Sequence, residues 1–455
     1  MTSTMEADIQ AHTVVHLDSA CNNQSNSQPR IRKVPCILRG VDKNRRCYNP
    51  MVVSIGPFHH GRPGLQLLEQ LKMEQEQQFI SYLGSEFPAF DRNFDEVAMR
   101  ARDCYDLSTL GHPDLGPLTE LSSKDFKCMM FRDGCFILHF ICCVAENKPG
   151  YSKMKIDQRA FVLRDLFLLE NQLPFIVLKT LMIIRFGEEK SKELITNFIQ
   201  RQTVFPGNPP LQEDNQPLHL LDLLRNELVR AAPSKSPLFQ IWPMSQPRDG
   251  TTTTTTTTTE LEGWHSFRAV TELKASGVEC KRSTTCSLKE ISFKIGLIKG
   301  YLLLPPIVID DSTQPKLLNL VAYETCPDAP DDFTVTSYIC FLDSLIDSAE
   351  DVKELRSKGI LHNVLGSDQQ VADLFNDLTI DLVPDPELYR DVKSGIERHY
   401  RSTVRSWMAD MRQTYFHNPW SVIALVAATL ALLLTMVQTY YAIFPSNNND
   451  SSKKP

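Results

Sequence analysis

The sequence lacks the motifs by which most enzymes are recognised. It contains no nucleophile elbow, phosphate-binding loop, HExxH motif or dinucleotide fingerprint, each of which sets reactive groups at a spacing that the chemistry requires. No cysteine pair has the spacing of a zinc site, since Cys280 and Cys286 stand alone without a second pair or matched histidines. We therefore predict no metal and no cofactor.

Positive charge is not concentrated anywhere in the chain. The formal net charge is -7, and no cluster of lysine and arginine stands out. A protein that binds nucleic acid needs a basic face to neutralise phosphates. With 42% hydrophobic and 23% charged residues, the composition is that of a globular protein. We expect no nucleic acid among its partners.

A secretory signal is also missing from the sequence. Residues 1–30 contain no apolar run of signal-peptide length and no basic leader, and we interpret them as a disordered polar tail. The 12 cysteines do not have the pattern of a disulfide framework. Cys128, Cys135 and Cys142 recur on one face of an apolar helix, with Cys143 adjacent, which is typical of buried thiols. Both features favour a body in the cytosol.

A long apolar run near the C-terminus is the clearest positive feature. Residues 420–444 read WSVIALVAATLALLLTMVQTYYAIF, without one charged side chain. As a helix, this run would be about 37 Å long, enough to cross a hydrocarbon core of about 30 Å. Trp420, Tyr440 and Tyr441 lie near its ends, where aromatic side chains anchor membrane helices. We predict one transmembrane helix that holds the chain in a lipid bilayer, followed by a short polar tail, residues 445–455.

The position of this run predicts the orientation of the protein. Because so few residues follow it, the targeting signal would emerge only as synthesis ends, and insertion after translation would leave the body in the cytosol. We expect the plasma membrane or the endoplasmic reticulum as the location. The run contains two overlapping pairs of alanines four positions apart, Ala424 with Ala428 and Ala427 with Ala431. They would allow self-association through the helix, although alanine is common in any such span.

Residues 31–417 have the pattern of a mainly helical body with a small β element, an α+β fold. Apolar residues recur at helical spacing in residues 65–83, 123–147 and 157–186, which predicts three long helices. Ile291, Phe293 and Ile295 alternate with polar residues, which predicts strands in that part of the chain.

Two interruptions are expected in this body. Pro174 should end or kink the third helix, because proline removes an amide donor and clashes with the preceding turn. Asn171 and Gln172, just before it, are placed to satisfy the backbone groups freed at the kink. Residues 231–262 contain nine consecutive threonines, and we interpret this region as a disordered surface insertion.

Adjacent histidines give the first candidate site. The run VVSI, residues 52–55, has the composition of a short strand and is closed by glycine and proline, so we expect His59 and His60 to lie on a turn. With Glu69 and Lys72 nearby, they would form an acid/base or metal cluster, and Asp133 would orient a base. The alternative, which we favour, is that they brace the turn.

Asp133 and Glu170 are further candidates, because each is a carboxylate in a strongly apolar helix. A buried charge must find a partner or become neutral. Arg132, Arg164 and Arg185 are the partners that we expect from the sequence. A structural ion pair is favoured over a catalytic carboxylate.

Seven blocks of the chain resemble a land-plant family catalogued as domain of unknown function 247. They are KVPCILR, MVVSIGPFHHG, MFRDGCFILHF, LFLLENQLPF, VTELKASGVECK, LLNLVAYETC and the closing NPW. They occur in the family's order over residues 31–444, and the threonine run lies where such proteins vary in length. The resemblance implies a plant membrane protein whose biochemical activity is not established. Some grass relatives are implicated in pollen self-recognition.

Two functional hypotheses follow from these features. The first is a membrane-tethered interaction or signalling protein that is not an enzyme and that binds a protein partner of unknown identity. It is motivated by a large helical body, one anchor and no catalytic motif. The alternative is a membrane-tethered hydrolase that uses the turn of His59 and His60 with a buried carboxylate.

Overall fold

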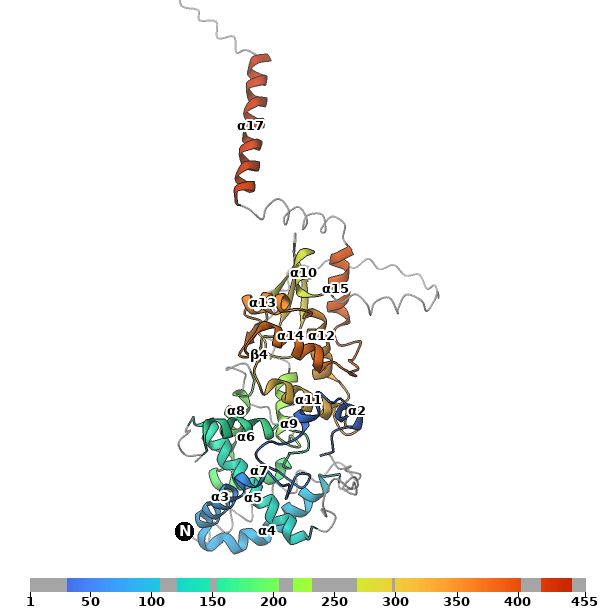
Figure 1. Ribbon diagram of the computed structural model, residues 1–455. Helices are drawn as coiled ribbons and strands as arrows, with labels where there is room; N and C mark the ends of the chain where they lie inside the picture. Colours follow the sequence, from blue (N-terminus) through green and yellow to red (C-terminus); the bar gives the residue numbers. More distant parts are fainter. Residues whose placement is uncertain are drawn as a thin grey trace, which may run out of the picture.

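The computed structural model describes residues 31–106, 121–147, 154–203, 216–230, 268–296, 299–401 and 419–443. The protein is mainly helical with small β-sheets (Figure 1), as the sequence predicts. The expected disordered tails and the threonine-rich insertion lie outside the described residues, as do the side chains of Trp420 and Tyr441.

The first half of the body is built from helices, where η marks a short 3-10 helix. These are α2 (Cys36–Arg39), η1 (Arg45–Tyr48), η2 (Gln66–Leu68), α3 (Glu69–Leu83), η3 (Gly84–Glu86), α4 (Phe87–Asp103), α5 (Ser123–Ala145), α6 (Ile156–Asp165), α7 (Phe175–Phe186), α8 (Glu188–Gln200) and α9 (Leu220–Val229).

The second half mixes helices and strands, and a long helix follows it. The elements are α10 (Val270–Ala275), β1 (Val278–Arg282), β2 (Ser292–Ile295), β3 (Gly300–Leu304), β4 (Ile307–Ile309), α11 (Thr313–Glu324), α12 (Thr334–Leu345), α13 (Ala349–Ser357), β5 (Leu361–Asn363), α14 (Asp368–Leu378), α15 (Arg390–Arg401) and α17 (Pro419–Ile443).

Helix α5 is the centre of the first half, where it packs against α3, α4, α7 and α8. It begins at Ser123 as expected, but its cap is Ser122, whose hydroxyl accepts a hydrogen bond from the Asp125 amide. Gly134 allows α7 to approach closely, since a Cβ there would lie 2.5 Å from Leu181 Cδ1. Of the thiols predicted to be buried, Cys135 and Cys143 are buried and Cys142 is partly buried, but Cys128 is exposed, so the prediction was wrong there.

In the described part of the chain, α5 is also the one helix long and apolar enough to cross a membrane. However, 72% of its most apolar window is buried within the body. This burial is typical of a core helix. A shorter apolar helix, Val426–Tyr440, lies within α17.

The predicted third helix is divided into α6 and α7 with Pro174 between them. Pro174 occupies the N-cap of α7, where its missing amide costs no helical hydrogen bond. The break begins earlier than proline alone requires, because α6 ends at Asp165. The segment between the two helices is buried from Leu166 to Leu173.

The second half contains a mixed three-stranded sheet in the order β1-β3-β2. β3 pairs parallel to β1, with Val278 opposite Gly300, and antiparallel to β2, with Phe293 opposite Leu302. Helix α15 packs against β2. A separate parallel pair joins β4 to β5. The predicted β element is therefore present, although residues 52–55 are not part of it.

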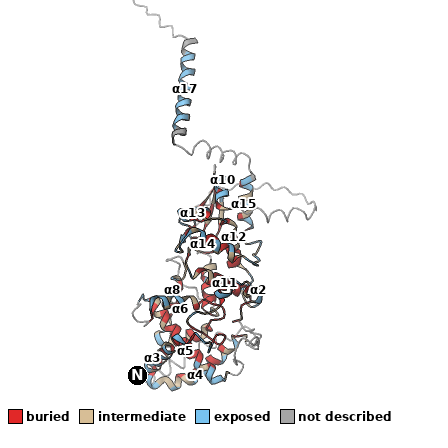
Figure 2. Ribbon diagram, in the orientation of Figure 1, coloured by how far each residue is buried: buried red, intermediate tan, exposed pale blue. Residues whose placement is uncertain are grey.

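The N-terminal segment, residues 31–60, contacts both halves and is called the strap. Its Arg32 pairs with Asp328 at 2.8 Å, and its Lys43 pairs with Asp377 at 2.7 Å. The side-chain amide of Asn319, in α11, donates to the carbonyl of Cys47. One continuous apolar core runs through both halves, and Figure 2 shows the buried residues along the inner faces of the helices in each.

Candidate functional site

Asp165 fixes part of the strap by accepting hydrogen bonds from consecutive backbone amides. Its Oδ2 accepts from Met51 and Val52, both at 2.8 Å, and from Val53 at 3.2 Å. The carboxylate is fully buried, and Arg164 donates to its other oxygen at 2.9 Å. Because one side chain takes these amides, the strand predicted for residues 52–55 does not form. The prediction of a strand was wrong.

Asn171 and Gln172 satisfy backbone groups of the unwound segment, as predicted. The Asn171 amide donates to the carbonyl of Asp165 at 2.9 Å, and its oxygen accepts from the Ile55 amide at 2.7 Å. Gln172 Nε2 donates to two carbonyls of the segment, those of Leu166 and Leu168, at 2.8 and 2.7 Å. Both residues are 1% exposed. Their role is structural.

Asp133 forms a buried ion pair with Lys72, which we did not predict as its partner. Its Oδ1 lies 2.7 Å from Lys72 Nζ, and its Oδ2 accepts from the Gly56 amide at 2.9 Å. Lys72 is 1% exposed and also contacts Glu69 and the Ser54 carbonyl. Burial opposes protonation of Lys72, but the charges of Asp133 and Glu69 outweigh it and raise its pKa. This ion pair holds the strap against α3 and α5.

None of the three arginines expected to neutralise Asp133 and Glu170 does so, and Arg185 stacks on Tyr82 instead. Arg132 pairs with Glu76, and Arg164 with Asp165. A buried ion pair was predicted correctly for Asp133, but its partner was predicted wrongly. The signal for Lys72 was present, since its spacing from Phe79 and Leu83 places it on the buried face of α3.

Glu170 holds another part of the strap. Its Oε1 accepts from the Val34 amide at 2.8 Å and from Arg39 Nη2 at 2.6 Å. Its Oε2 lies 3.6 Å from His59 Nε2. The structure therefore brings His59 and Glu170 together.

His59 and His60 lie on a turn, as predicted, but they face different surroundings. His59 is fully buried, neither ring nitrogen has a hydrogen-bond partner within the described residues, and His60 is exposed. Burial, with Arg62, Arg39 and Lys33 nearby, lowers the pKa of His59 to about 3. At neutral pH this imidazole is uncharged. The two histidines do not share one acid/base site.

These residues form a framework, which we call the polar belt: Asp133, Asp165, Glu170, Asn171 and Gln172. The belt requires a glycine at position 56, because φ is +70° there and a Cβ would lie 2.8 Å from the Gln172 carbonyl oxygen. Across the described ranges, no group of three His, Cys, Asp or Glu residues could hold a metal ion. The polar belt forms hydrogen bonds to buried backbone amides and carbonyls.

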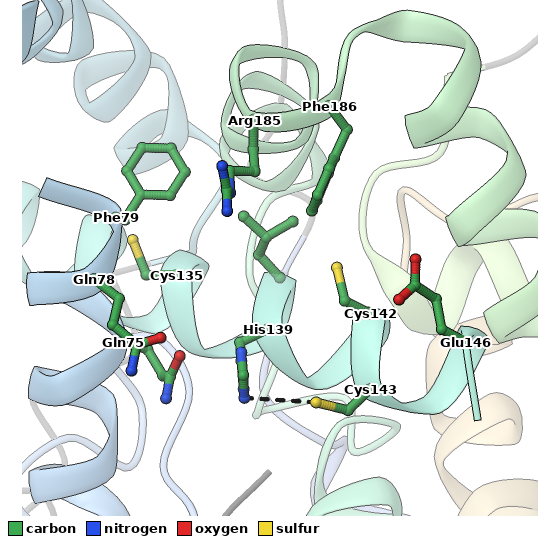
Figure 3. Close-up of a pocket in the computed structure, with 11 residues that line it drawn as sticks. Gln75, Gln78, Phe79, Cys135, His139, Cys142, Cys143, Glu146, Arg185 and Phe186 are labelled. Carbon is green, nitrogen blue, oxygen red and sulfur yellow. Dashed lines mark hydrogen bonds between the residues drawn. The ribbon is translucent and has the colours of Figure 1, made fainter. Parts of the chain in front are cut away.

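A pocket of about 250 Å³ lies elsewhere, between α3, α5 and the end of α7. Figure 3 shows the side chains that converge on it. It is lined by Gln75, Gln78, Phe79, Cys135, Leu138, His139, Cys142, Cys143, Glu146, Arg185 and Phe186. Phe79, Cys135 and Leu138 are at most 5% exposed and give it an apolar floor. None of the site residues predicted from the sequence lines this pocket.

Two of the three thiols of the pocket are not activated for nucleophilic chemistry. Burial raises the pKa of Cys142 to about 12 and that of Cys135 well above its ordinary value. A protonated thiol is a poor nucleophile, so Cys135 and Cys142 do not supply one. The third sulfur, that of Cys143, lies 3.5 Å from His139 Nε2.

Two polar groups in the pocket have no protein partner. Gln75 is 5% exposed, and its amide makes no hydrogen bond to any described residue. The Arg185 guanidinium stacks on Tyr82, 3.9 Å from the ring centroid, and lies 5.6 Å from that of Phe186. It has no ion pair within the described part of the chain. The sequence carried one signal for this site, a glutamine on the apolar face of α3.

A family model matches most of the chain, as the resemblance of the seven blocks implies. The model described as "Plant protein of unknown function", domain of unknown function 247, matches residues 31–434. The chain belongs to this family.

Curated relatives carry names that do not describe an activity. The UPF0481 protein At3g47200 of Arabidopsis thaliana is 28% identical over 436 residues, covering 91% of this chain and 87% of the relative. The putative UPF0481 protein At3g02645 of the same plant is 23% identical over 482 residues, covering 88% of each. No solved structure matches the chain.

Proposed function

We propose that this chain is a membrane-anchored protein whose helical body acts by binding, with α17 as its single span. One observation carries the anchor. The large apolar side chains described in α17 are exposed over its length, from 51% at Val437 to 69% at Met436. The helix has 25 residues, enough to cross a bilayer. An apolar surface of this extent is unfavourable in water and is stabilised in lipid.

The use of the buried polar groups supports binding over catalysis. The carboxylates proposed as catalytic candidates, Asp133 and Glu170, each accept from a strap amide and from a cation. His59 is buried and His60 is exposed. A general base must reach the proton that it removes, and this arrangement gives the hydrolase alternative no support.

The lack of disulfides among the described residues supports a body on the cytosolic side. No disulfide joins any two of the eleven described cysteines, and five of them are buried. Thiols stay reduced in the cytosol, whereas secreted proteins commonly form disulfides. The proposed orientation therefore places the N-terminal body in the cytosol and the short C-terminal tail across the membrane.

Alkaline carbonate extraction of membranes tests the anchor. The full-length protein should stay in the membrane pellet, and a variant carrying Leu432→Arg and Leu434→Arg should move to the supernatant, because charge at the centre of a span is costly. The matched control is Ile37→Arg, which changes an apolar residue of the body that is 66% exposed. Release of the unaltered protein by carbonate would overturn the anchor.

Protease protection on intact vesicles tests the orientation. An epitope before Ile31 should be digested without detergent, and an epitope after Lys454 should be protected. The reverse pattern would place the body outside the cytosol. Binding is tested by purification from mild detergent under several conditions, which should recover a stoichiometric protein partner. Consistent recovery of the chain alone would contradict a role in protein interaction.

A further inference from the structure

The pocket between α3, α5 and α7 contains a glutamine whose side-chain amide the fold does not use. Gln75 lies on the buried face of α3 with Lys72, Phe79 and Leu83. Lys72 is satisfied by Asp133, whereas no hydrogen bond joins the Gln75 amide to a described residue. Its atoms are not among the fully buried polar atoms without a partner. The amide therefore keeps access to solvent at the lining of the pocket, where a ligand can reach it.

Arg185 provides a second group that is available to a ligand. Stacking on Tyr82 holds the guanidinium plane and leaves its edge, which carries the N–H donors, without an ion pair to any described residue. Such an edge matches the two oxygens of a carboxylate. Figure 3 places Arg185 across the pocket from Gln75 and Gln78.

Between these two polar groups the pocket is apolar. Phe79 and Leu138 are buried in its floor, and Phe186 lies beside Arg185 in its wall. Flat apolar rings pack well against aromatic side chains. The volume of about 250 Å³ lies just below the range of pockets for drug-sized ligands, roughly 300–1,000 Å³. It therefore suits a small molecule.

We propose that this pocket binds a small, flat, apolar organic acid, with its carboxylate on Arg185 and a hydrogen-bonding substituent at its other end on Gln75. The ligand is held without covalent bonding. The site lies in the helical body, so the proposal does not depend on the membrane anchor.

Three related probes separate the two polar contacts. 6-Hydroxy-2-naphthoate carries both groups, 2-naphthoate lacks the hydroxyl, and 2-naphthol lacks the carboxylate. Binding is measured by calorimetry with the full-length protein in detergent, with empty micelles subtracted because the probes enter them. We expect 6-hydroxy-2-naphthoate to bind most tightly of the three.

Two variants assign the contacts. Arg185→Gln should weaken binding of both acids about tenfold and leave 2-naphthol unchanged, because it removes the charge-assisted hydrogen bonds. Gln75→Leu should weaken 6-hydroxy-2-naphthoate about fivefold and leave 2-naphthoate unchanged, because one neutral hydrogen bond is lost. The matched control is Arg92→Gln, an exposed arginine of α4 outside the pocket.

The melting temperature of the unliganded variants provides an independent readout. Gln75→Leu should melt at the same temperature as the unaltered protein or higher, since the Gln75 amide has no hydrogen bond to a described residue to lose and the leucine adds apolar contact at a buried position. A purely structural glutamine would give a lower melting temperature. The proposal would be overturned if the unaltered protein bound none of the probes or bound all three equally. It would also be overturned if Arg185→Gln bound both acids as tightly as the unaltered protein does.

Discussion

Helix α5 contributes to two regions that differ in how their polar groups are satisfied. In the polar belt, Asp133 has a lysine and a backbone amide as partners, and Gln172 bonds to two carbonyls. Buried polar groups are normally paired in this way. In the pocket, Arg185 is exposed and the Gln75 amide keeps access to solvent, and neither has a hydrogen bond or ion pair to a described residue. The comparison therefore separates residues that hold the fold from residues that are available to a ligand.

The largest expected effect comes from breaking the belt at its ion pair. Lys72→Met should lower the free energy of unfolding by about 3–5 kcal/mol, because it leaves Asp133 buried and unpaired. Denaturant titration with circular dichroism measures the change. The control is Lys190→Met, since the pair of Lys190 with Glu193 is exposed and such pairs contribute about 1 kcal/mol or less.

A second variant determines whether the Asp133 charge is the cause. The double change Lys72→Met with Asp133→Asn should recover part of the lost stability, because the amide oxygen still accepts from Gly56 without carrying a charge. If the double variant is less stable than Lys72→Met alone, the loss comes from the missing lysine contacts, and the ion-pair explanation fails.

A pair of equivalent substitutions compares the two regions directly. Gln172→Leu should destabilise the protein by about 2–3 kcal/mol, because it removes the hydrogen bonds of Gln172 to the Leu166 carbonyl and the Leu221 amide and one of the two that the Leu168 carbonyl accepts. Gln75→Leu should cost nothing measurable. Parallel thermal melts of the two variants provide the test, and equal losses would remove the distinction between belt and pocket.

The smallest effect concerns the pH dependence of stability at His59, beside the belt. The pKa of this imidazole is lowered to about 3 in the folded protein and is about 6.5 when unfolded. Below pH 6.5 the unfolded chain therefore binds the extra proton, and stability falls as the pH falls. The loss is about 1.4 kcal/mol per pH unit, so about 2 kcal/mol between pH 6.5 and 5.

Unfolding titrations at several pH values test this dependence. His59→Leu should flatten the slope relative to the unaltered protein, while His60→Leu, which changes the exposed neighbour, should retain it. His219, whose pKa burial lowers to about 4, contributes to the slope of every variant. An unchanged slope in His59→Leu would show that this imidazole is not buried in its neutral form.

The helices and the break at Pro174 could be predicted because their signals are local. Apolar periodicity gave α3 and α5, and proline chemistry gave the division of α6 from α7. Residues 52–55 misled the prediction, since their composition favours a strand but their amides bond to Asp165, more than a hundred residues away. Local pattern carries no information about such a distant partner.

The candidate site was predicted only in part, because its residues come from distant parts of the sequence. A buried carboxylate in an apolar helix signals an ion pair, but it does not say which cation supplies it, and Lys72 comes from another helix. The pocket could not be predicted, because its lining comes from three helices and exists only once they pack. Gln75 was visible in the sequence as a polar residue at an apolar position, without anything to indicate its role.

The strap has a consequence for the order in which the protein folds. Arg32 pairs with a residue 296 positions later in the sequence, and Lys43 with one 334 positions later. Contacts of such long sequence separation form slowly, because the closure entropy must be overcome first. On the ribosome, the strap is made first but completes its contacts only after Asp377 has been synthesised. The earliest residues of the body are therefore among the last to reach their native positions.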